Sequence, residues 1–131
     1  MLQNTTWVGV LAISVGAVPG AVSRYYLTEL CRSTLGPNFP SGTFLINFTG
    51  CFLMGFFLTY FKEIQGLPSE IDLMVRTGFL GAYTTFSTYG YDTFFLWRSG
   101  RRKTTFFYWL GSAVLAVIGI ILGRYLANLI G

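Results

Sequence analysis

The sequence predicts an all-α integral membrane protein: a single domain, residues 1–131, with four transmembrane helices, the third interrupted inside the membrane. The first observation is composition, because 53% of the residues are hydrophobic and only 11% are charged, whereas a soluble domain carries roughly 25% charged residues. The mean hydropathy of +0.56 agrees. The second is that the apolar residues gather into four segments, which short stretches rich in charge, Pro and Gly separate. The third is a run of hydroxyl residues inside the third segment.

The composition also argues against an enzyme. The sequence contains no histidine and five acidic residues, so the commonest proton shuttle and both Ser-His and Cys-His catalysis are absent. The net charge of +4 comes from basic residues that flank the apolar segments. This placement is typical of anchoring to anionic lipid headgroups. We therefore expect membrane lipid, and no nucleic acid, as the partner of these charges.

The first segment is expected to form a helix over about residues 7–29. A signal peptide is the competing interpretation, but the start lacks the basic residues of such a peptide. Gly16 and Gly20 are four residues apart, a spacing that lets two helices approach closely. Arg24 continues the same helical face. Its side chain either extends to the membrane surface or attracts anions into a vestibule.

The second segment, about residues 41–61, carries no charge over its whole length. Its length matches the roughly 20 residues that a membrane-spanning helix needs. Asn47 is the polar residue that stands out in it. A buried amide in a membrane helix needs a partner. The partner is either a neighbouring helix or an ion in a pore that the amide N–H groups face.

The third segment is expected over residues 70–97, with Ser69 and Asp72 forming a capping box at its start. Its uncharged part, residues 77–91, is short for a regular span. Glycines and then a Ser/Thr-rich run occupy residues 78–89. A lone strand cannot cross a bilayer, so we expect a helix with a break near residues 81–87. Non-helical backbone at membrane depth is tolerated only where protein or a water-filled cavity covers it, which makes this stretch the leading candidate for a binding or conduction site.

The fourth segment is expected over residues 104–128. Gly119 and Gly123 repeat the close-packing pattern. Tyr108 and Ser112 are four residues apart, so their hydroxyls share one helical face. They serve either as an interfacial Tyr and a packing Ser or as part of a polar track.

The polar groups at membrane depth are mostly hydrogen-bond donors. Hydroxyls and amides can stabilise an anion without a fixed charge, and the partly positive edge of an aromatic ring can do the same. A broken helix also offers free backbone carbonyls, which suit a monovalent cation such as sodium. The residues therefore predict a small-anion pathway with room for a structural cation, and they do not name the anion.

Three blocks of the sequence, residues 16–25, 40–55 and 78–88, resemble the CrcB/Fluc family of fluoride channels. The first reads GAVPGAVSRY, the second begins PSGT and contains NFTG, and the third contains GFLG and TTFST. The third is the most specific. The likeness covers nearly the whole chain in length, helix order and motif placement.

The resemblance implies a homodimer of antiparallel subunits, a so-called dual topology, with two pores that export fluoride passively from the cytoplasm and lower its toxicity. It implies a structural sodium ion at the dimer centre, held by the backbone carbonyls of Gly81 and Thr84, and a vestibule near Arg24. The implied pore residues are Asn47, Phe86, Ser87, Thr88, Tyr89, Tyr108 and Ser112. The chain departs from the pattern of the family at two positions. Tyr89 stands where the family usually has a second Phe, and Asp92 stands where it often has Glu.

The distribution of basic residues bears on the second subunit. In a four-helix topology one side of the membrane receives three basic residues, and the other side receives six: Arg24, Arg32, Arg98, Arg101, Arg102 and Lys103. This bias fits either a preferred orientation or a paralogous partner subunit. Two other functions are alternatives. A small multidrug-type exporter needs an embedded Glu in the first helix, where no acid precedes Glu29, and a non-transporting scaffold would use the polar residues only to join helices.

Overall fold

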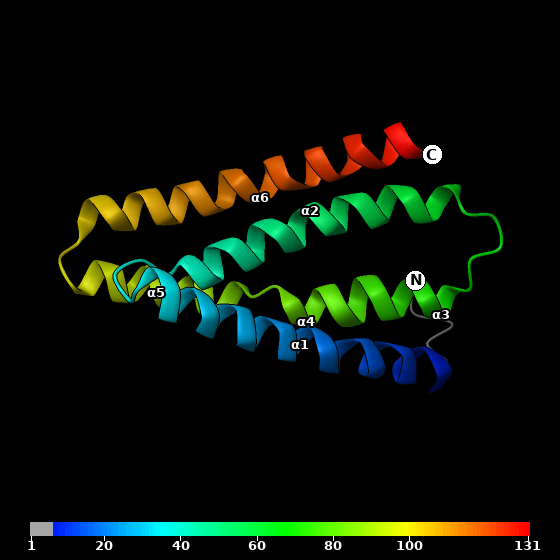
Figure 1. Cartoon of the computed structure of the whole chain (residues 1–131), viewed down its shortest axis with the longest axis horizontal. Helices are drawn as coiled ribbons and strands as arrows, with labels where there is room; N and C mark the ends of the chain where they lie inside the picture. Colours follow the sequence, from blue (N-terminus) through cyan, green and yellow to red (C-terminus); the bar gives the residue numbers. More distant parts are fainter. Residues whose placement is uncertain (1–6) are drawn as a thin grey trace.

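The computed structural model describes residues 7–131, and these form helices joined by short turns (Figure 1). The prediction of an all-α fold is confirmed. Along the chain the elements are α1 (Trp7–Leu35), α2 (Ser41–Glu63), α3 (Ser69–Asp72), the π-helix η1 (Leu73–Leu80), α4 (Gly81–Tyr83), α5 (Phe86–Arg98) and α6 (Arg102–Ile130).

Three of these helices, α1, α2 and α6, are long and apolar enough to cross a membrane. All three extend past the ends expected from the sequence. α1 continues from residue 29 to Leu35, and α6 already begins at Arg102. Each extension adds polar or charged residues to a helix end, where they can leave the apolar layer while the backbone hydrogen bonds continue.

The third segment is divided between α3, η1, α4 and α5, which follow one another along the length of the molecule (Figure 1). Thr84 and Thr85 interrupt it, since both have extended backbone angles (φ −79°, ψ 157° and φ −149°, ψ 117°). The break expected near residues 81–87 is therefore two residues long.

The start of the third segment differs from the prediction. The capping box is wrong: Pro68 precedes the first helical residue, which is Ser69, and no side chain caps this helix. Asp72 instead forms an ion pair with Arg76 one turn later. The π-helix that follows was not expected from the sequence.

Two close helix contacts hold the bundle together, and both are made by the glycine pairs. A Cβ atom on Gly16 would lie 2.0 Å from the carbonyl oxygen of Met74 in η1, and one on Gly123 would lie 2.0 Å from that of Phe52 in α2. A Cβ atom on Gly20 would lie 2.2 Å from the carbonyl oxygen of Phe79, and one on Gly119 would lie 3.0 Å from that of Phe48. A side chain would thus clash with backbone at all of these glycines except Gly119, which is tightly packed, so the predicted close packing at both pairs is confirmed.

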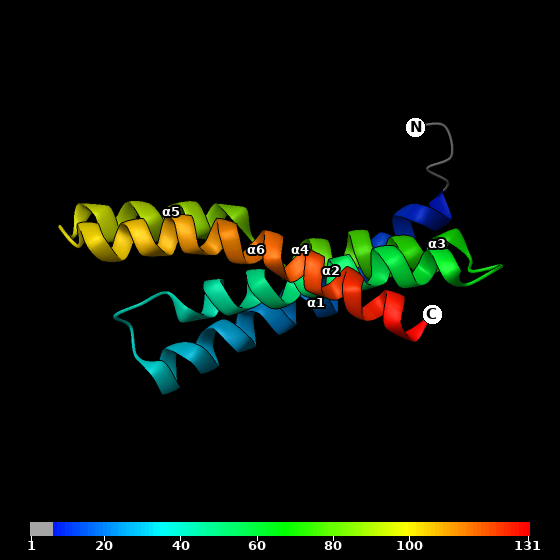
Figure 2. The ribbon, with the colours of Figure 1, turned by 90° about the horizontal axis from the view of Figure 1, so that it is seen from above.

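The two ends of the molecule differ in which segments they hold. The start of α1, the turn between α2 and α3, and the C-terminus lie at one end, and the turns at residues 36–40 and 99–101 lie at the other (Figure 1). Towards this second end, α1 and α2 diverge from α5 and α6 (Figure 2). The divergence leaves room for a cavity between the two pairs of helices, whose lining residues are described below.

Candidate functional site

The break in the third segment is held by the side-chain amide of Asn47. Its Nδ2 donates to the backbone oxygen of Thr85 at 3.0 Å, and its Oδ1 accepts from the backbone N–H of Thr85 at 2.8 Å. Thr85 is buried, so both of its backbone groups need a protein partner. The partner that Asn47 needs is therefore the non-helical backbone itself, an option that the sequence pattern could not distinguish from a neighbouring helix.

This pairing changes the hydrogen bonds on both sides of the break. In a continuous helix the N–H of Thr85 would bond to the carbonyl of Gly81, four residues earlier, but it is directed to Asn47 instead. The preceding carbonyl, that of Leu80, accepts from both the N–H and the hydroxyl of Thr84 at 3.0 Å. The carbonyl of Gly81 is thereby released from the helical pattern.

On the other side of the break, Thr85 caps the N-terminus of α5. Its hydroxyl oxygen accepts from the backbone N–H of Thr88 at 3.2 Å, as an N-cap residue does. The hydroxyl groups of Thr88 and Ser87 lie 3.0 and 3.3 Å from it. The hydroxyl run is therefore a connected cluster at a helix start.

A cavity of about 290 Å³ lies beside the break. Four of the predicted pore residues line it, together with Thr84. One of them, Ser112, has a buried hydroxyl oxygen that is without a hydrogen-bond partner among the described residues. A buried hydroxyl without a partner is costly and marks a place where a ligand or water would be favourable. The lining residues are Asn47, Cys51, Thr84, Thr85, Phe86, Tyr89, Ser112, Ala113 and Ala116.

Aromatic rings extend from this cavity towards the end of the molecule that holds the turn at residues 99–101. The ring of Tyr89 lies 5.6 Å from that of Phe86 and 5.6 Å from that of Tyr108. Its hydroxyl donates to the backbone oxygen of Trp109 at 2.8 Å. This bond fixes the ring and occupies the hydroxyl, so Tyr89 presents mainly its ring to the cavity, as a Phe would.

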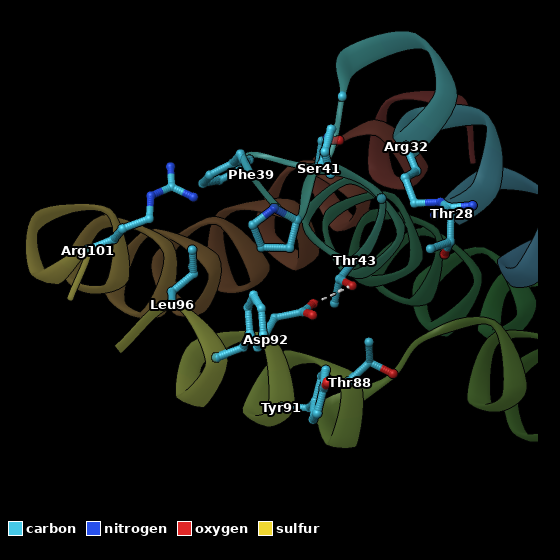
Figure 3. A pocket seen from close by; sticks show the side chains of 15 residues that line it. Thr28, Arg32, Phe39, Ser41, Thr43, Thr88, Tyr91, Asp92, Leu96 and Arg101 are labelled. Carbon is cyan, nitrogen blue, oxygen red and sulfur yellow. Dashed lines mark hydrogen bonds between the residues drawn. The ribbon is translucent and has the colours of Figure 1, made fainter. Parts of the chain in front are cut away.

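A second, larger cavity of about 520 Å³ opens between α1, α2 and α5 (Figure 3). Asp92 points into it and accepts from the hydroxyl of Thr43 at 2.8 Å and from that of Tyr108 at 3.2 Å. The hydroxyl of Tyr108 therefore faces a carboxylate, and the side chain is fully buried. The sequence analysis did not single out Thr43; its signal is its place in the PSGT block at the start of a long apolar helix. Thr88 also lines this cavity.

The remaining predicted site residues lie elsewhere. Four of them are outside the residues that line these two cavities: Arg24, Gly81, Ser87 and Tyr108. The arginines at the larger cavity are Arg32 and Arg101. Arg32 is paired with Glu29 at 2.7 Å, and Arg101 donates to the backbone oxygen of Asn38. A vestibule role for Arg24 stays a prediction, and the arginines that line the larger cavity are ones that the sequence analysis counted only as charges.

The family is identified by comparison with known proteins. The model of the family described as CrcB-like protein, Camphor Resistance (CrcB), matches residues 11–124. A Trichormus variabilis protein is 48% identical, over 100% of this chain and 96% of its own length. Relatives from Synechococcus and Synechocystis species are 47% and 43% identical, each over 90% of this chain and 91% of their own length. All three are named fluoride-specific ion channel FluC. The chain is therefore a multi-pass membrane protein that belongs to the CrcB family.

Proposed function

We propose that this protein is a fluoride-selective channel that lets fluoride leave the cytoplasm passively. In acidified surroundings fluoride is protonated to neutral HF, which can enter the cell. There it ionises in the near-neutral cytoplasm, and the fluoride anion is trapped. An inside-negative membrane potential favours exit of the anion, so a channel needs no energy source to lower fluoride toxicity. The names of the relatives support this function for the present chain.

The observation that carries the proposal is the cavity beside the Asn47–Thr85 pair. A side-chain amide has two N–H donors, and the pair uses one of them for the Thr85 carbonyl. Asn47 with this second donor, Phe86 with its ring and Ser112, whose hydroxyl has no partner among residues 7–131, belong to the same cavity wall. A small anion that has lost its water needs several donors at once, and this wall contains no acidic side chain.

The proposed assembly is an antiparallel pair of subunits, each crossing the membrane four times, with the divided third segment as one crossing. Phe86 supports a partner at this position, because the residue is 83% exposed in the single chain although it lines the cavity. A second subunit that covers Phe86 would close the open side of the cavity. That subunit is either another copy of this chain or a paralogue.

A structural sodium ion at the centre of the pair also belongs to the proposal. The described residues contain no group of three or more His, Cys, Asp or Glu side chains that could hold a metal. The available ligands at the break are backbone carbonyls, and these suit a hard monovalent cation. The carbonyls of Gly81 and Thr84 would hold it, the first because the N–H of Thr85 bonds to Asn47.

A proton-coupled drug exporter fits these residues less well. Such an exporter needs an acidic side chain within its first helix. The first acid of α1 is Glu29, near the end of the helix, and its carboxylate is exposed and paired with Arg32. A non-transporting scaffold would be expected to satisfy its buried polar groups internally, whereas the hydroxyl of Ser112 has no such partner among the described residues.

The test is release of fluoride from liposomes that contain the purified protein. A fluoride electrode follows the release of fluoride. In the control, potassium chloride replaces potassium fluoride inside the liposomes, and a chloride electrode follows the release of chloride. We expect rapid fluoride release, with chloride release at the level of protein-free liposomes. A folded protein that releases no fluoride, or that releases both anions equally, would refute the proposal.

A further inference from the structure

Thr49 of α2 and Tyr83 of α4 form a hydrogen bond beside the break, with 2.9 Å between their hydroxyl oxygens. The hydroxyl of Thr49 also lies 2.8 Å from the carbonyl oxygen of Leu45 in its own helix, to which it donates. A threonine hydroxyl has a single proton to donate, so Tyr83 is the donor in the bond between the two hydroxyls. Tyr83 is buried, and Thr49 is the partner that its hydroxyl needs there.

The short helix α4 depends on its neighbours for its position. It is three residues long, which is less than one helical turn, and so short a helix is not stable by itself. The ring of Tyr83 stacks on that of Phe79, with 5.8 Å between their centres. A Cβ atom on Gly50 of α2 would lie 2.2 Å from Cγ2 of Thr84 and 3.2 Å from Cδ1 of Tyr83. Gly50 therefore lets α2 approach closely enough for the hydroxyls of Thr49 and Tyr83 to meet.

The backbone is held to α2 on both sides of Thr84. Tyr83 precedes it and bonds to Thr49, and Thr85 follows it and bonds to Asn47. The carbonyl of Thr84 and the N–H of Thr85 belong to one peptide group, and no peptide bond between residues 7 and 131 is cis. In a trans peptide group the N–H and the carbonyl point in opposite directions. Because the N–H faces Asn47, the carbonyl of Thr84 is directed away from that side chain.

We propose that Thr49 and Tyr83 are positioning residues for the carbonyl of Thr84. Their hydrogen bond holds α4 on α2 and so keeps this carbonyl in the place where it would bind the sodium ion. The inference rests on the sodium site of the proposed function and adds two side chains that act on a ligand of that site. Groups that orient metal ligands contribute about 10-fold to 100-fold to the affinity for the metal.

The test measures how strongly sodium stabilises the detergent-purified protein against heat. The melting temperature is recorded while sodium chloride replaces N-methyl-D-glucamine chloride at constant ionic strength. A cation that binds the folded protein raises the melting temperature by mass action, so the sodium concentration needed for a given rise is proportional to the dissociation constant. Tyr83→Phe should raise this concentration about tenfold.

The two partners of the hydrogen bond can be removed one at a time. Tyr83→Phe keeps the buried ring and its stacking on Phe79. The hydroxyl of Thr49 still donates to the carbonyl of Leu45, so this variant leaves no donor unpaired and should fold. Thr49→Val instead leaves the buried hydroxyl of Tyr83 without its partner, which lowers stability. The double variant should melt at a higher temperature than Thr49→Val and have the sodium requirement of Tyr83→Phe.

Two matched controls lie further along α2. The hydroxyl of Thr59 donates to the carbonyl of Gly55 in its own helix at 3.2 Å, and the ring of Tyr60 stacks on that of Phe56. Thr59→Val and Tyr60→Phe therefore make the same chemical changes away from the break. Both variants should keep the sodium requirement of the unaltered chain.

A role in packing alone would give a different result. Tyr83→Phe would then lower the melting temperature by the same amount at every sodium concentration, and this outcome would overturn the inference. The positioning role requires the deficit in melting temperature to be larger with sodium than without it. A rise in sodium requirement that Thr59→Val and Tyr60→Phe share equally would also overturn the inference, because it would not depend on the bond between Thr49 and Tyr83.

Failure of this inference can be distinguished from failure of the proposed function. Sodium that stabilises the unaltered chain and Tyr83→Phe equally at each concentration would refute the positioning role alone. Sodium that does not stabilise the unaltered chain would refute the sodium site, and the inference with it. Fluoride release from liposomes tests the channel itself and is measured independently of both melting experiments.

Discussion

Replacing Asn47 by Asp is the sharpest test of the proposed anion pathway. The change keeps an oxygen to accept from the backbone N–H of Thr85 at 2.8 Å. It replaces the amide nitrogen, which donates to the Thr85 carbonyl at 3.0 Å, by a second oxygen. The side chain keeps its size and shape, and the difference is confined to one lost donor group and one added negative charge.

The expected size of the effect follows from these two differences. The Thr85 carbonyl loses its partner, which costs about 1–3 kcal/mol of folding stability. A negative charge about 4 Å from a passing anion raises the energy of that anion by about 4 kcal/mol at an effective dielectric constant of about 20. Because 1.4 kcal/mol corresponds to a factor of ten, fluoride release should fall about a thousandfold, far more than the change in stability accounts for.

The assay is fluoride release from liposomes, with Asn47→Ala as the matched variant and gel filtration as the check on assembly. Asn47→Ala removes the donors without adding charge, so its release rate should lie between those of the unaltered chain and Asn47→Asp. If Asn47→Asp is folded and releases fluoride within about twofold of the unaltered rate, Asn47 only supports the helix break, and the pathway lies elsewhere.

Three further outcomes are expected. Phe86→Ile should lower fluoride release while the pair of subunits stays intact in gel filtration, because the ring edge is lost and apolar bulk is kept; normal release would reduce the ring to packing. Ser112→Ala should slow release without lowering the melting temperature, because its buried hydroxyl has no partner among the described residues to lose; a lower melting temperature would contradict this. Gly123→Val should destabilise the protein by several kcal/mol, since even a Cβ atom would lie 2.0 Å from the carbonyl oxygen of Phe52. Gly111→Ala should be tolerated, because Gly111 has open space around it. Equal melting temperatures for the two variants would contradict the close contact between α2 and α6 at Gly123.

The helix contacts were predictable because they depend on local spacing. Two pairs of glycines in apolar segments are each four residues apart, Gly16 with Gly20 and Gly119 with Gly123. A helix places residues at this spacing on one face. The start of the third segment was not predictable in the same way. The sequence offers Ser69 and Asp72 a capping box, but Asp72 lies four residues before Arg76 and pairs with it instead. A competing partner one turn later is not visible in the capping pattern.

The candidate site was predictable in its residue types and only partly in its partners. A polar, glycine-containing stretch inside an apolar segment indicates a break, and a lone Asn indicates a buried partner. These two signals belong to one contact only because α2 and the third segment lie side by side. The spacing of residues within either segment does not specify which segments are neighbours. The same limit applies to Asp92, whose two hydroxyl donors, Thr43 and Tyr108, come from different helices.

The contact between Asn47 and Thr85 links the two ion sites that we propose. The amide that would offer a donor to the anion also takes the Thr85 N–H away from the Gly81 carbonyl, and that carbonyl is a proposed sodium ligand. If the amide turned fully towards an anion, the Thr85 N–H could return to the helical pattern, and the carbonyl would become less available to a cation. Anion passage and cation retention should therefore be coupled through this one residue, so that a variant such as Asn47→Ala affects both sites although it contacts only one of them.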